Sequence, residues 1–483
     1  MQPNVLLVVI DSVRAKNTSL HDYERKTTPF LEEFAGVATH YQAARAPSVA
    51  SNPSHASMFT GLHAEEHMLT DRTKALSPGF TIFDELAREG YRTGLFTGNK
   101  FLSQLNIGFA DAFDIVESGS EHRLLFPLGY DPRLIDSAEG NKYLNFLMVA
   151  LRHERPLRSL FNGAIEKLPY RIVDRFPGSI RPTEHTGEQY TDLFLEWVSI
   201  EDGPWAACIN YMDAHMPYLP VEEYDRWSRP EASDPRALER PSFFYFSEEA
   251  NSANLKDLRD YYDGSILQVD AIVGRLVQEL DKRGLYDETL LVICADHGEG
   301  FGEPSDARSK PTIGHGVSGG VAEEVLHVPL LVKGPGQTTG RTVTEPASLT
   351  RFPDAVRQAL ANKLREDAFV PDGAAISYMA GMLPIIRPTA ERHVDDLSPF
   401  EPAIRVVYEA TEEGALKYIH RGNEALLIEC PDAQTIGTIE EVEPSIVDER
   451  YPNLERADVL RDDGGAEDLS AGLQQQLEYL GYV

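Results

Sequence analysis

Cysteine is scarce in this sequence. Cys208, Cys294 and Cys430 stand far apart among 483 residues. An odd and scattered set does not make a disulfide framework, and two of the three cysteines lie inside apolar, strand-like runs. We therefore expect buried thiols in a reducing compartment.

Long apolar runs are also missing. A helix needs about 20 apolar residues to cross a bilayer, and no stretch of this chain approaches that length. The N-terminal segment MQPNVLLVVIDS has no basic region, and its apolar run is six residues long. It predicts a buried strand rather than a signal peptide. These absences favour a cytoplasmic protein with no transmembrane segment.

Positive charge is in short supply. Asp and Glu number 77 against 45 Lys and Arg, the net charge is −32, and Lys contributes only 12 of the 45. A surface of this kind repels phosphates, so we expect no nucleic-acid partner. Because salt screens the self-repulsion of the chain, an acidic and lysine-poor surface fits a halophilic origin.

Short β-branched runs that end abruptly in polar residues are present in several places. They include Val5–Ile10, Thr93–Thr97, Trp205–Tyr211 and Leu290–Ala295. Helical patterns lie between them, at Pro29–Ala38, Thr81–Glu89 and Asp257–Arg283. This alternation predicts an α/β fold with a doubly wound, mostly parallel sheet sandwiched by helices. Ligands bind at the carboxyl ends of such strands, so the polar residues that follow the runs are expected to converge.

The chain is too long for one simple core. We expect a catalytic α/β domain at 1–345, with a helical insertion at about 118–190, and a C-terminal α+β subdomain at 346–483. Three strand-like pieces of the subdomain predict a small antiparallel sheet: Ile404–Tyr408, Ala415–Ile419 and Ala425–Ile428.

The insertion is locally basic, with seven basic and three acidic residues from Leu151 to Arg181. It is expected to pack on the core as helices. The alternative is a lid or a docking surface for an anionic substrate or a membrane face.

Acidic and imidazole side chains follow two of the predicted strands. Asp11 comes directly after the first run, and Asp296 and His297 come directly after Leu290–Ala295. A lone Asp at such a place is more often a helix cap. Two carboxylates and an imidazole at neighbouring strand ends concentrate negative charge, and a divalent metal removes the cost. The sequence therefore predicts a metal site.

A short buried helix is predicted in the segment ASNPSHASMFTG, residues 50–61, because Pro53 lies near its first turn and Gly61 ends it. Ser51 falls at or just before the N-cap. It is either a cap or an oxygen nucleophile whose anion the helix N-terminus and a metal would both stabilise.

These motifs together resemble the sulfatase family of the alkaline-phosphatase superfamily. They occur in family order as NVLLVVIDSVR with Thr28-Pro29-Phe30-Leu31, the helix from Ser51 to Leu62, Tyr211-Met212-Asp213-Ala214-His215-Met216-Pro217-Tyr218, Tyr262-Asp263-Gly264 with Val269-Asp270, ADHGEGFGE, Gly314-His315-Gly316 and Glu323-Glu324-Val325. Each motif alone is weak, but the whole series at family spacing is specific.

The resemblance implies a role for each matching residue. Asp11, Asp296 and His297 would hold the metal, and the Ser51 oxygen would complete the site as the nucleophile. His215 and His315 would act in catalysis by binding ester oxygens or protonating the leaving group, with His315 in place of a lysine. The residues expected to contact the substrate are His55, Asn99, Lys100 and Asp213.

Two departures from the family pattern bear on the cofactor. The resemblance implies one divalent ion, Ca²⁺, but Ser12 stands where the family has a second acidic residue and His297 where many members have Asn, so Mn²⁺ or Zn²⁺ stays open. Family sulfatases convert Cys or Ser to formylglycine in a (Cys/Ser)-x-Pro-x-Arg context. Here His55 replaces the arginine, which argues against conversion of Ser51.

Hydrolysis of sulfate esters is the first hypothesis, on a small or glycan-linked substrate. The main alternative is a phosphodiester or phosphonate monoester hydrolase that uses unmodified Ser51. A transferase that moves a phospho-alcohol group and a non-catalytic binding protein are further alternatives. The sequence makes no prediction of the oligomeric state.

Overall fold

The computed structural model describes residues 2–70, 73–118, 130, 142–153, 155–165, 187–200, 203–235, 238, 242–246, 252–304 and 311–462. Its centre is an eight-stranded sheet in the order β12-β2-β11-β8-β1-β7-β5-β6. The strands are β1 (Asn4–Ile10), β2 (Thr39–Tyr41), β5 (Arg92–Thr97), β6 (Ile115–Glu117), β7 (Trp205–Tyr211), β8 (Thr289–Cys294), β11 (Leu330–Lys333) and β12 (Arg341–Val343). Strands β8, β1, β7, β5 and β6 run parallel, whereas β11 is antiparallel to both of its neighbours.

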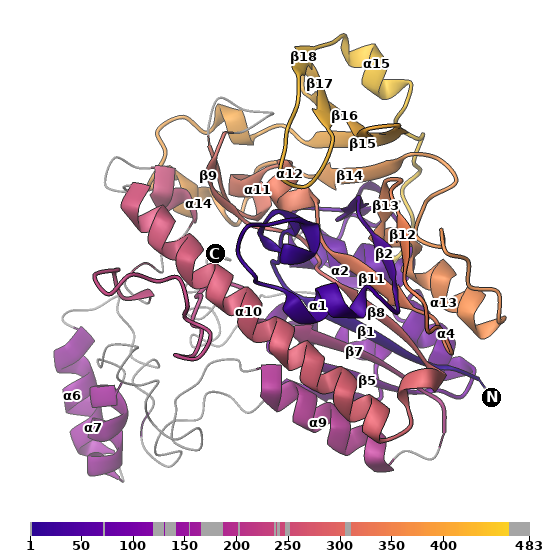
Figure 1. Ribbon diagram of the computed structural model, residues 1–483. Helices are drawn as coiled ribbons and strands as arrows, with labels where there is room; N and C mark the ends of the chain where they lie inside the picture. The colour runs from indigo at the N-terminus through magenta and orange to yellow at the C-terminus, as the bar shows by residue number, and fades with distance from the viewer. Residues whose placement is uncertain are drawn as a thin grey trace.

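Helices cover both faces of this sheet (Figure 1). One layer holds α1 (Pro29–Phe34), α9 (Gly187–Ile200) and the long α10 (Ser252–Lys282), and the other holds α2 (Ser51–Thr60), α4 (Ile82–Arg88) and α13 (Phe352–Leu360). All seven residues of β1 are buried, as a strand covered on both faces must be. The prediction of a mostly parallel, helix-sandwiched α/β fold is confirmed.

The register of the central strands brings their carboxyl ends to one edge. Strand β1 lies between β7 and β8, with Ile10 opposite Tyr211 and Val9 opposite Cys294. The residue that follows β1 therefore lies beside the residues that follow β8 and β7. This register is why polar residues almost 300 positions apart in the sequence can form one site.

A second, antiparallel sheet lies above the first in Figure 1. It has the order β14-β15-β16-β17-β18. Its strands are β14 (Ala375–Met379), β15 (Ile404–Thr411), β16 (Gly414–Arg421), β17 (Glu424–Cys430) and β18 (Ile439–Glu441). The prediction of a C-terminal antiparallel sheet is confirmed. The boundary at residue 345 stays a prediction, because β13 (Ala347–Ser348) still pairs with β3 (Ala44–Arg45).

The predicted helical insertion is described in part. Helices α6 (Lys142–Arg152) and α7 (Pro156–Ile165) form a hairpin, while most other residues of 118–190 lie outside the described ones. Within the described chain, no helix combines the length and the apolar composition that crossing a membrane requires.

Several shorter elements connect the layers. They are α3 (Ala64–His67), α5 (Lys100–Ser103), α11 (Gly316–Gly319), α12 (Glu323–Leu326), α14 (Arg387–Glu391), α15 (Pro444–Asp448), β4 (Ala75–Leu76), β9 (Gly300–Glu303), β10 (Thr312–Gly314) and β19 (Leu460–Arg461).

A buried ionic network joins the antiparallel sheet to the α/β part of the molecule. Glu323, the first residue of α12, contacts the guanidinium of Arg45 at 2.9 Å and the ammonium of Lys417 at 3.1 Å. Tyr408 donates a hydrogen bond of 2.7 Å to the same carboxylate. Burial alone would raise the pKa of Glu323, but Arg45 and Lys417 hold it far below its usual range. One carboxylate thus neutralises a cation of β3, in the α/β part, and a cation of β16, in the antiparallel sheet.

We predict that Glu323→Gln lowers the free energy of unfolding by about 3–5 kcal/mol, because it leaves two buried cations without their counter-charge. Urea unfolding of the full chain measures the loss. The matched control is Glu401→Gln, which breaks the exposed pair with Arg387 and should cost less than about 1 kcal/mol. Equal, small losses in both variants would contradict the role of the network.

Candidate active site

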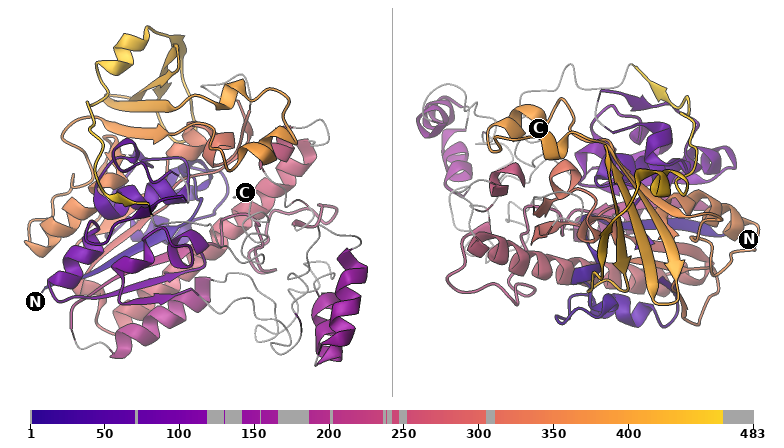
Figure 2. Two further views of the ribbon diagram at one scale, coloured as in Figure 1. Left: turned by 180° about the vertical axis from the view of Figure 1, so that it is seen from behind. Right: turned by 90° about the horizontal axis from the view of Figure 1, so that it is seen from above.

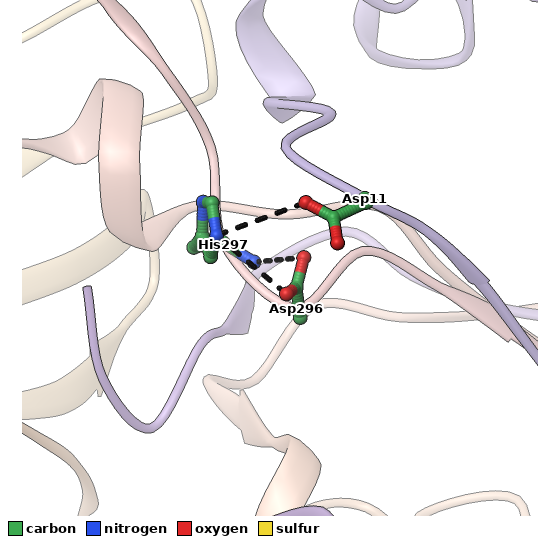
Figure 3. A group of neighbouring side chains, drawn as sticks. All are labelled: Asp11, Asp296 and His297. Atoms are coloured by element: carbon green, nitrogen blue, oxygen red, sulfur yellow. Dashed lines mark hydrogen bonds and ion pairs between the residues drawn. The ribbon is translucent and has the colours of Figure 1, made fainter. Parts of the chain in front are cut away.

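Three buried side chains gather at the carboxyl edge of the sheet (Figure 3). Asp11 follows β1, and Asp296 and His297 follow β8. One ligand atom from each lies within 4.8 Å of the others. The Nε2 atom of His297 is 3.5 Å from Asp296 Oδ2 and 3.9 Å from Asp11 Oδ1. The structure therefore brings together the three residues that the sequence indicates as metal ligands.

Amide and hydroxyl donors hold the Asp11 carboxylate. The side-chain amides of Asn99 and Asn210 each donate to Oδ2 at 3.2 Å, and the Ser12 hydroxyl donates to Oδ1 at 2.9 Å. Burial alone would raise the pKa of Asp11. The neighbouring imidazoles, His215 first, and the Asn210 hydrogen bond lower it to about 2. Asp11 is therefore a carboxylate throughout the physiological range.

Only one oxygen of the Asp296 carboxylate accepts hydrogen bonds. Its Oδ1 accepts hydrogen bonds from the backbone N–H groups of Ser12 at 3.3 Å and His297 at 3.0 Å. Its Oδ2 is buried and has no hydrogen-bond partner. A buried, charged oxygen left in this way is costly, and a cation at the centre of the three side chains would satisfy it. The donor set therefore fits a divalent metal.

A backbone contact orients the His297 ring. Its Nδ1 lies 3.0 Å from the carbonyl oxygen of Gly298, so Nδ1–H donates there and the Nε2 lone pair faces the carboxylates. Gly298 itself permits this, because a Cβ atom at that position would lie 2.1 Å from the carbonyl oxygen of Glu324. The close approach of the two chain segments requires glycine.

Ser51 lies at the start of α2, facing His297. Its Oγ is 3.2 Å from His297 Nε2. Ala50 is the N-cap and Ser51 is the first helical residue, so Ser51 is not the cap of this helix. The hydroxyl is therefore free of a capping bond and points at the metal-binding atoms.

His55 lies one turn further along α2, behind the acidic pair. Its Nδ1 is 2.9 Å from the Ser51 carbonyl oxygen and 3.5 Å from Asp296 Oδ2. Its Nε2 is buried without a hydrogen-bond partner, and the ring packs edge-on against Phe59. These contacts direct His55 toward Asp296. Its predicted contact with a substrate stays a prediction.

Two more histidines complete the cluster. The ring centroid of His315 is 4.4 Å from that of His297 and 5.2 Å from that of His215. His215 Nδ1 lies 2.7 Å from the Met216 carbonyl oxygen. Burial lowers the pKa of His215, although Asp11 opposes the shift. The backbone contact fixes the orientation of the His215 ring.

Glu299 is a member of the site that the sequence analysis missed. Its two carboxylate oxygens lie 3.2 and 3.3 Å from His315 Nδ1. Burial alone would lower the pKa of His315, but Glu299 raises it above its ordinary value. The negative charge of Glu299 therefore favours the protonated form of His315. A carboxylate two residues after the DH pair was the signal that could have identified it.

Three other residues were predicted to contact the substrate: Asp213, Asn99 and Lys100. Two of them, Asp213 and Asn99, form hydrogen bonds within the protein. Asp213 accepts hydrogen bonds of 2.9 Å from the N–H of Gly187, at the start of α9, and from the Gln268 amide. Burial raises the pKa of Asp213 to about 7. Asn99 turns its amide to Asp11, and Lys100 begins α5 with a half-buried side chain. Contact of these residues with a substrate stays a prediction.

The fold and the site define an α/β protein with a candidate metal centre at the carboxyl edge of its sheet. A family model described as Sulfatase matches residues 3–360, and the chain belongs to the sulfatase family. Arylsulfatase K from Bos taurus is 24% identical over 364 residues, which are 72% of this chain and 60% of that protein. N-acetylglucosamine-6-O-sulfatase from Bacteroides thetaiotaomicron is 22% identical over 345 residues, 62% of this chain and 59% of that protein.

The fold has close counterparts among solved structures. The phosphonate monoester hydrolase of Agrobacterium radiobacter superposes with a TM-score of 0.59 at 20% identity, over 88% of each chain. The alkaline-phosphatase-like architecture is thereby shown. In sequence, the match spans only about 60% of the length of the sulfatases named above.

We predict that Asp296→Asn lowers the affinity for a divalent ion at least tenfold, because it removes a charged ligand from the centre. Dialysis against Mn²⁺ followed by elemental analysis gives the metal content per chain. The control is Asp372→Asn, an exposed carboxylate far along the chain, which should leave the content unchanged. Full occupancy in the Asp296 variant would overturn the ligand assignment.

Proposed function

We propose that this chain hydrolyses sulfate esters by attack of the Ser51 oxygen, in a site where Asp11, Asp296 and His297 hold one divalent ion. The observation that carries the proposal is the position of Ser51 Oγ, buried at the first residue of α2 and 3.2 Å from His297 Nε2. Membership of the sulfatase family over residues 3–360 supports it.

The chemistry follows from the groups that surround Ser51. When bound, the ion would neutralise charge that develops on the ester oxygens. The Ser51 hydroxyl gives up its proton to solvent, and its oxygen forms a bond to sulfur while the bond from sulfur to the alcohol oxygen breaks; the departing oxygen takes a proton from His315 or His215. Water then hydrolyses the serine ester, which restores the Ser51 hydroxyl, releases sulfate and returns a proton to the histidine. When protonated, His315 would also stabilise the negative charge of the transferring group.

The substrate class proposed is a small or glycan-linked sulfate ester. The relative from Bacteroides thetaiotaomicron is named for an N-acetylglucosamine sulfate, which supports a sugar as the alcohol. The ion proposed is Ca²⁺ from the family resemblance. His297 adds a nitrogen ligand that suits Mn²⁺ or Zn²⁺ as well.

A phosphonate monoester or phosphodiester hydrolase is the second candidate. The contact of His55 with the Ser51 carbonyl oxygen favours it, because the arginine of the formylglycine motif is replaced by a side chain that is bonded to the helix backbone. Ser51 would then act as serine. A serine ester of phosphate is readily hydrolysed with help from a divalent ion, whereas a serine ester of sulfate is a harder intermediate to resolve.

The proposed setting is a reducing and salt-rich cytoplasm. All three cysteines are free and buried, and the net charge is −32. Such a charge costs least where salt screens it.

The function is tested on purified protein with an aryl sulfate, a phosphate diester and a phosphonate ester, each with Ca²⁺, Mn²⁺ and Zn²⁺. We expect turnover of the aryl sulfate to be highest, and Ser51→Ala to lower kcat by roughly a thousandfold or more. Ser398→Ala, an exposed hydroxyl, is the control. Peptide mapping shows residue 51 as serine or formylglycine. A preference for either phosphorus ester would replace the first proposal by the second.

We predict that His215→Ala lowers kcat/KM about 10²–10⁴-fold for esters with poor leaving groups and much less for activated aryl esters, because only the former need a proton. A series of phenol esters of graded acidity measures this dependence. His420→Ala is the control, since His420 pairs with Asp448 in the C-terminal sheet. An equal loss along the whole series would assign His215 to binding instead of proton transfer.

A further inference from the structure

Most of the exposed large apolar side chains of the described chain lie on one helical hairpin. Eight such residues are exposed, and five of them belong to α6 and α7: Leu147, Met148, Leu151, Leu157 and Phe161. The other three, Phe80, Ile200 and Ile439, lie in three separate elements or turns. Single exposed apolar residues are ordinary, but a group confined to one hairpin marks an interaction surface.

The two helices hold each other through a different set of residues. Gly163 of α7 packs against the ring of Phe146 of α6, where a Cβ atom would lie 2.2 Å from the ring. Ala150 and Ser159 are buried at 0% exposure. The hairpin thus has its own inner contact, and Leu147, Met148, Leu151 and Leu157 stay exposed beside it.

The exposed apolar residues form coherent faces. Leu147, Met148 and Leu151 stand at spacings of one and four on α6, and Leu157 and Phe161 stand four apart on α7, so each set shares one side of its helix. Leu151 is 57% exposed and Leu157 is 71% exposed. These two leucines flank the turn between the helices, which makes the tip of the hairpin apolar.

The same tip is positively charged. Arg152, Arg155 and Arg158 are exposed, and no carboxylate among the described residues pairs with Arg152 or Arg155. From Lys142 to Ile165 the sequence has four basic residues and one acidic residue, in a chain of net charge −32. Apolar side chains interleaved with arginine, on helices of opposite sign to the rest of the molecule, are typical of a surface that meets an anionic membrane.

The hairpin lies at the periphery, away from both sheets, in the three views of Figures 1 and 2. At 0.15 M ionic strength the charge of the acidic body is screened over about 8 Å. The electrostatic potential at the tip of the hairpin is therefore set more by its arginines than by the acidic body. This local positive charge favours an anionic partner.

We propose that the α6–α7 hairpin docks this protein on an anionic phospholipid bilayer. Leu151 and Leu157 enter the boundary between head groups and acyl chains, while the arginines reach lipid phosphates. With 11 and 10 residues, the helices are far shorter than the roughly 20 residues that span a bilayer. The hairpin therefore lies in the interface and does not cross it.

A second copy of this chain is a poorer partner for the hairpin. Outside the hairpin, the described residues offer only three dispersed exposed large apolar side chains, which cannot receive five. Two hairpins facing each other would repel through their arginines. An anionic bilayer suits the hairpin better, because it offers an apolar interior for the exposed side chains and negative charge for the arginines.

The test is co-sedimentation of the full chain with vesicles of phosphatidylcholine alone or with 30% phosphatidylglycerol. We expect binding to the anionic vesicles and little to the neutral ones, with a loss on raising the salt concentration. Arg152→Gln with Arg155→Gln should weaken partitioning about fivefold for each arginine. Leu151→Ser with Leu157→Ser should weaken it at least tenfold.

Matched controls separate docking from folding and from charge in general. Ile200→Ser removes a leucine-sized exposed residue from the end of α9, and Arg341→Gln with Arg365→Gln removes two exposed arginines near β12 and α13. Both should bind vesicles as the unchanged chain does. Because the hairpin substitutions are on exposed residues, circular dichroism and the melting temperature should not change.

Three outcomes would overturn the proposal. The first is that the unchanged chain does not bind anionic vesicles. The second is that the hairpin variants bind them as well as the unchanged chain does. The third is that vesicle binding is absent while sedimentation velocity shows self-association that the hairpin variants abolish. The last result would assign the hairpin to a protein partner. Hydrolysis of soluble esters should be the same in all variants, so failure here leaves the proposed function untouched.

Discussion

Asp11 and Asp296 hold two carboxylates against each other at adjacent strand ends, with water excluded on every side, and like charges at such separations repel strongly in a poor dielectric. Several neighbouring groups reduce this repulsion. Asn99, Asn210 and Ser12 donate to Asp11, imidazoles lower its pKa, and α2 directs its N-terminus toward the centre. One buried oxygen of Asp296 is still left without a partner. A divalent ion would complete the arrangement, and the hydroxyl of Ser51, the proposed nucleophile, lies beside the candidate ligand His297.

The histidines around this centre have distinct environments. His297 turns its Nε2 to the carboxylates by donating from Nδ1 to a backbone carbonyl, as metal ligands commonly do. His315 instead faces a carboxylate, Glu299, which raises its pKa. His215 donates to the backbone and its pKa is lowered. The acceptor that each Nδ1 atom contacts therefore suits each of the three imidazoles to a different role.

The second sheet and the hairpin extend the molecule in opposite ways. The antiparallel sheet is tied to the α/β unit by Glu323, which neutralises Arg45 and Lys417 in the interior. The hairpin exposes apolar and cationic side chains together, which is the basis of the proposed contact with an anionic bilayer.

The sequence by itself predicted the fold class, and it indicated three candidate metal ligands and a candidate nucleophile, because these depend on local patterns: apolar runs that end in Asp11 and Asp296, and a helix that opens at Ser51. It also predicted the C-terminal sheet. Tertiary structure alone decided the rest. Asn210 and Ser12 entered the site through contacts across strands and loops that no local pattern announces. Asp213, which the motifs direct to the substrate, accepts hydrogen bonds from Gly187 and Gln268, because a buried polar group needs a partner. Which neighbour supplies that partner is settled only when distant segments pack.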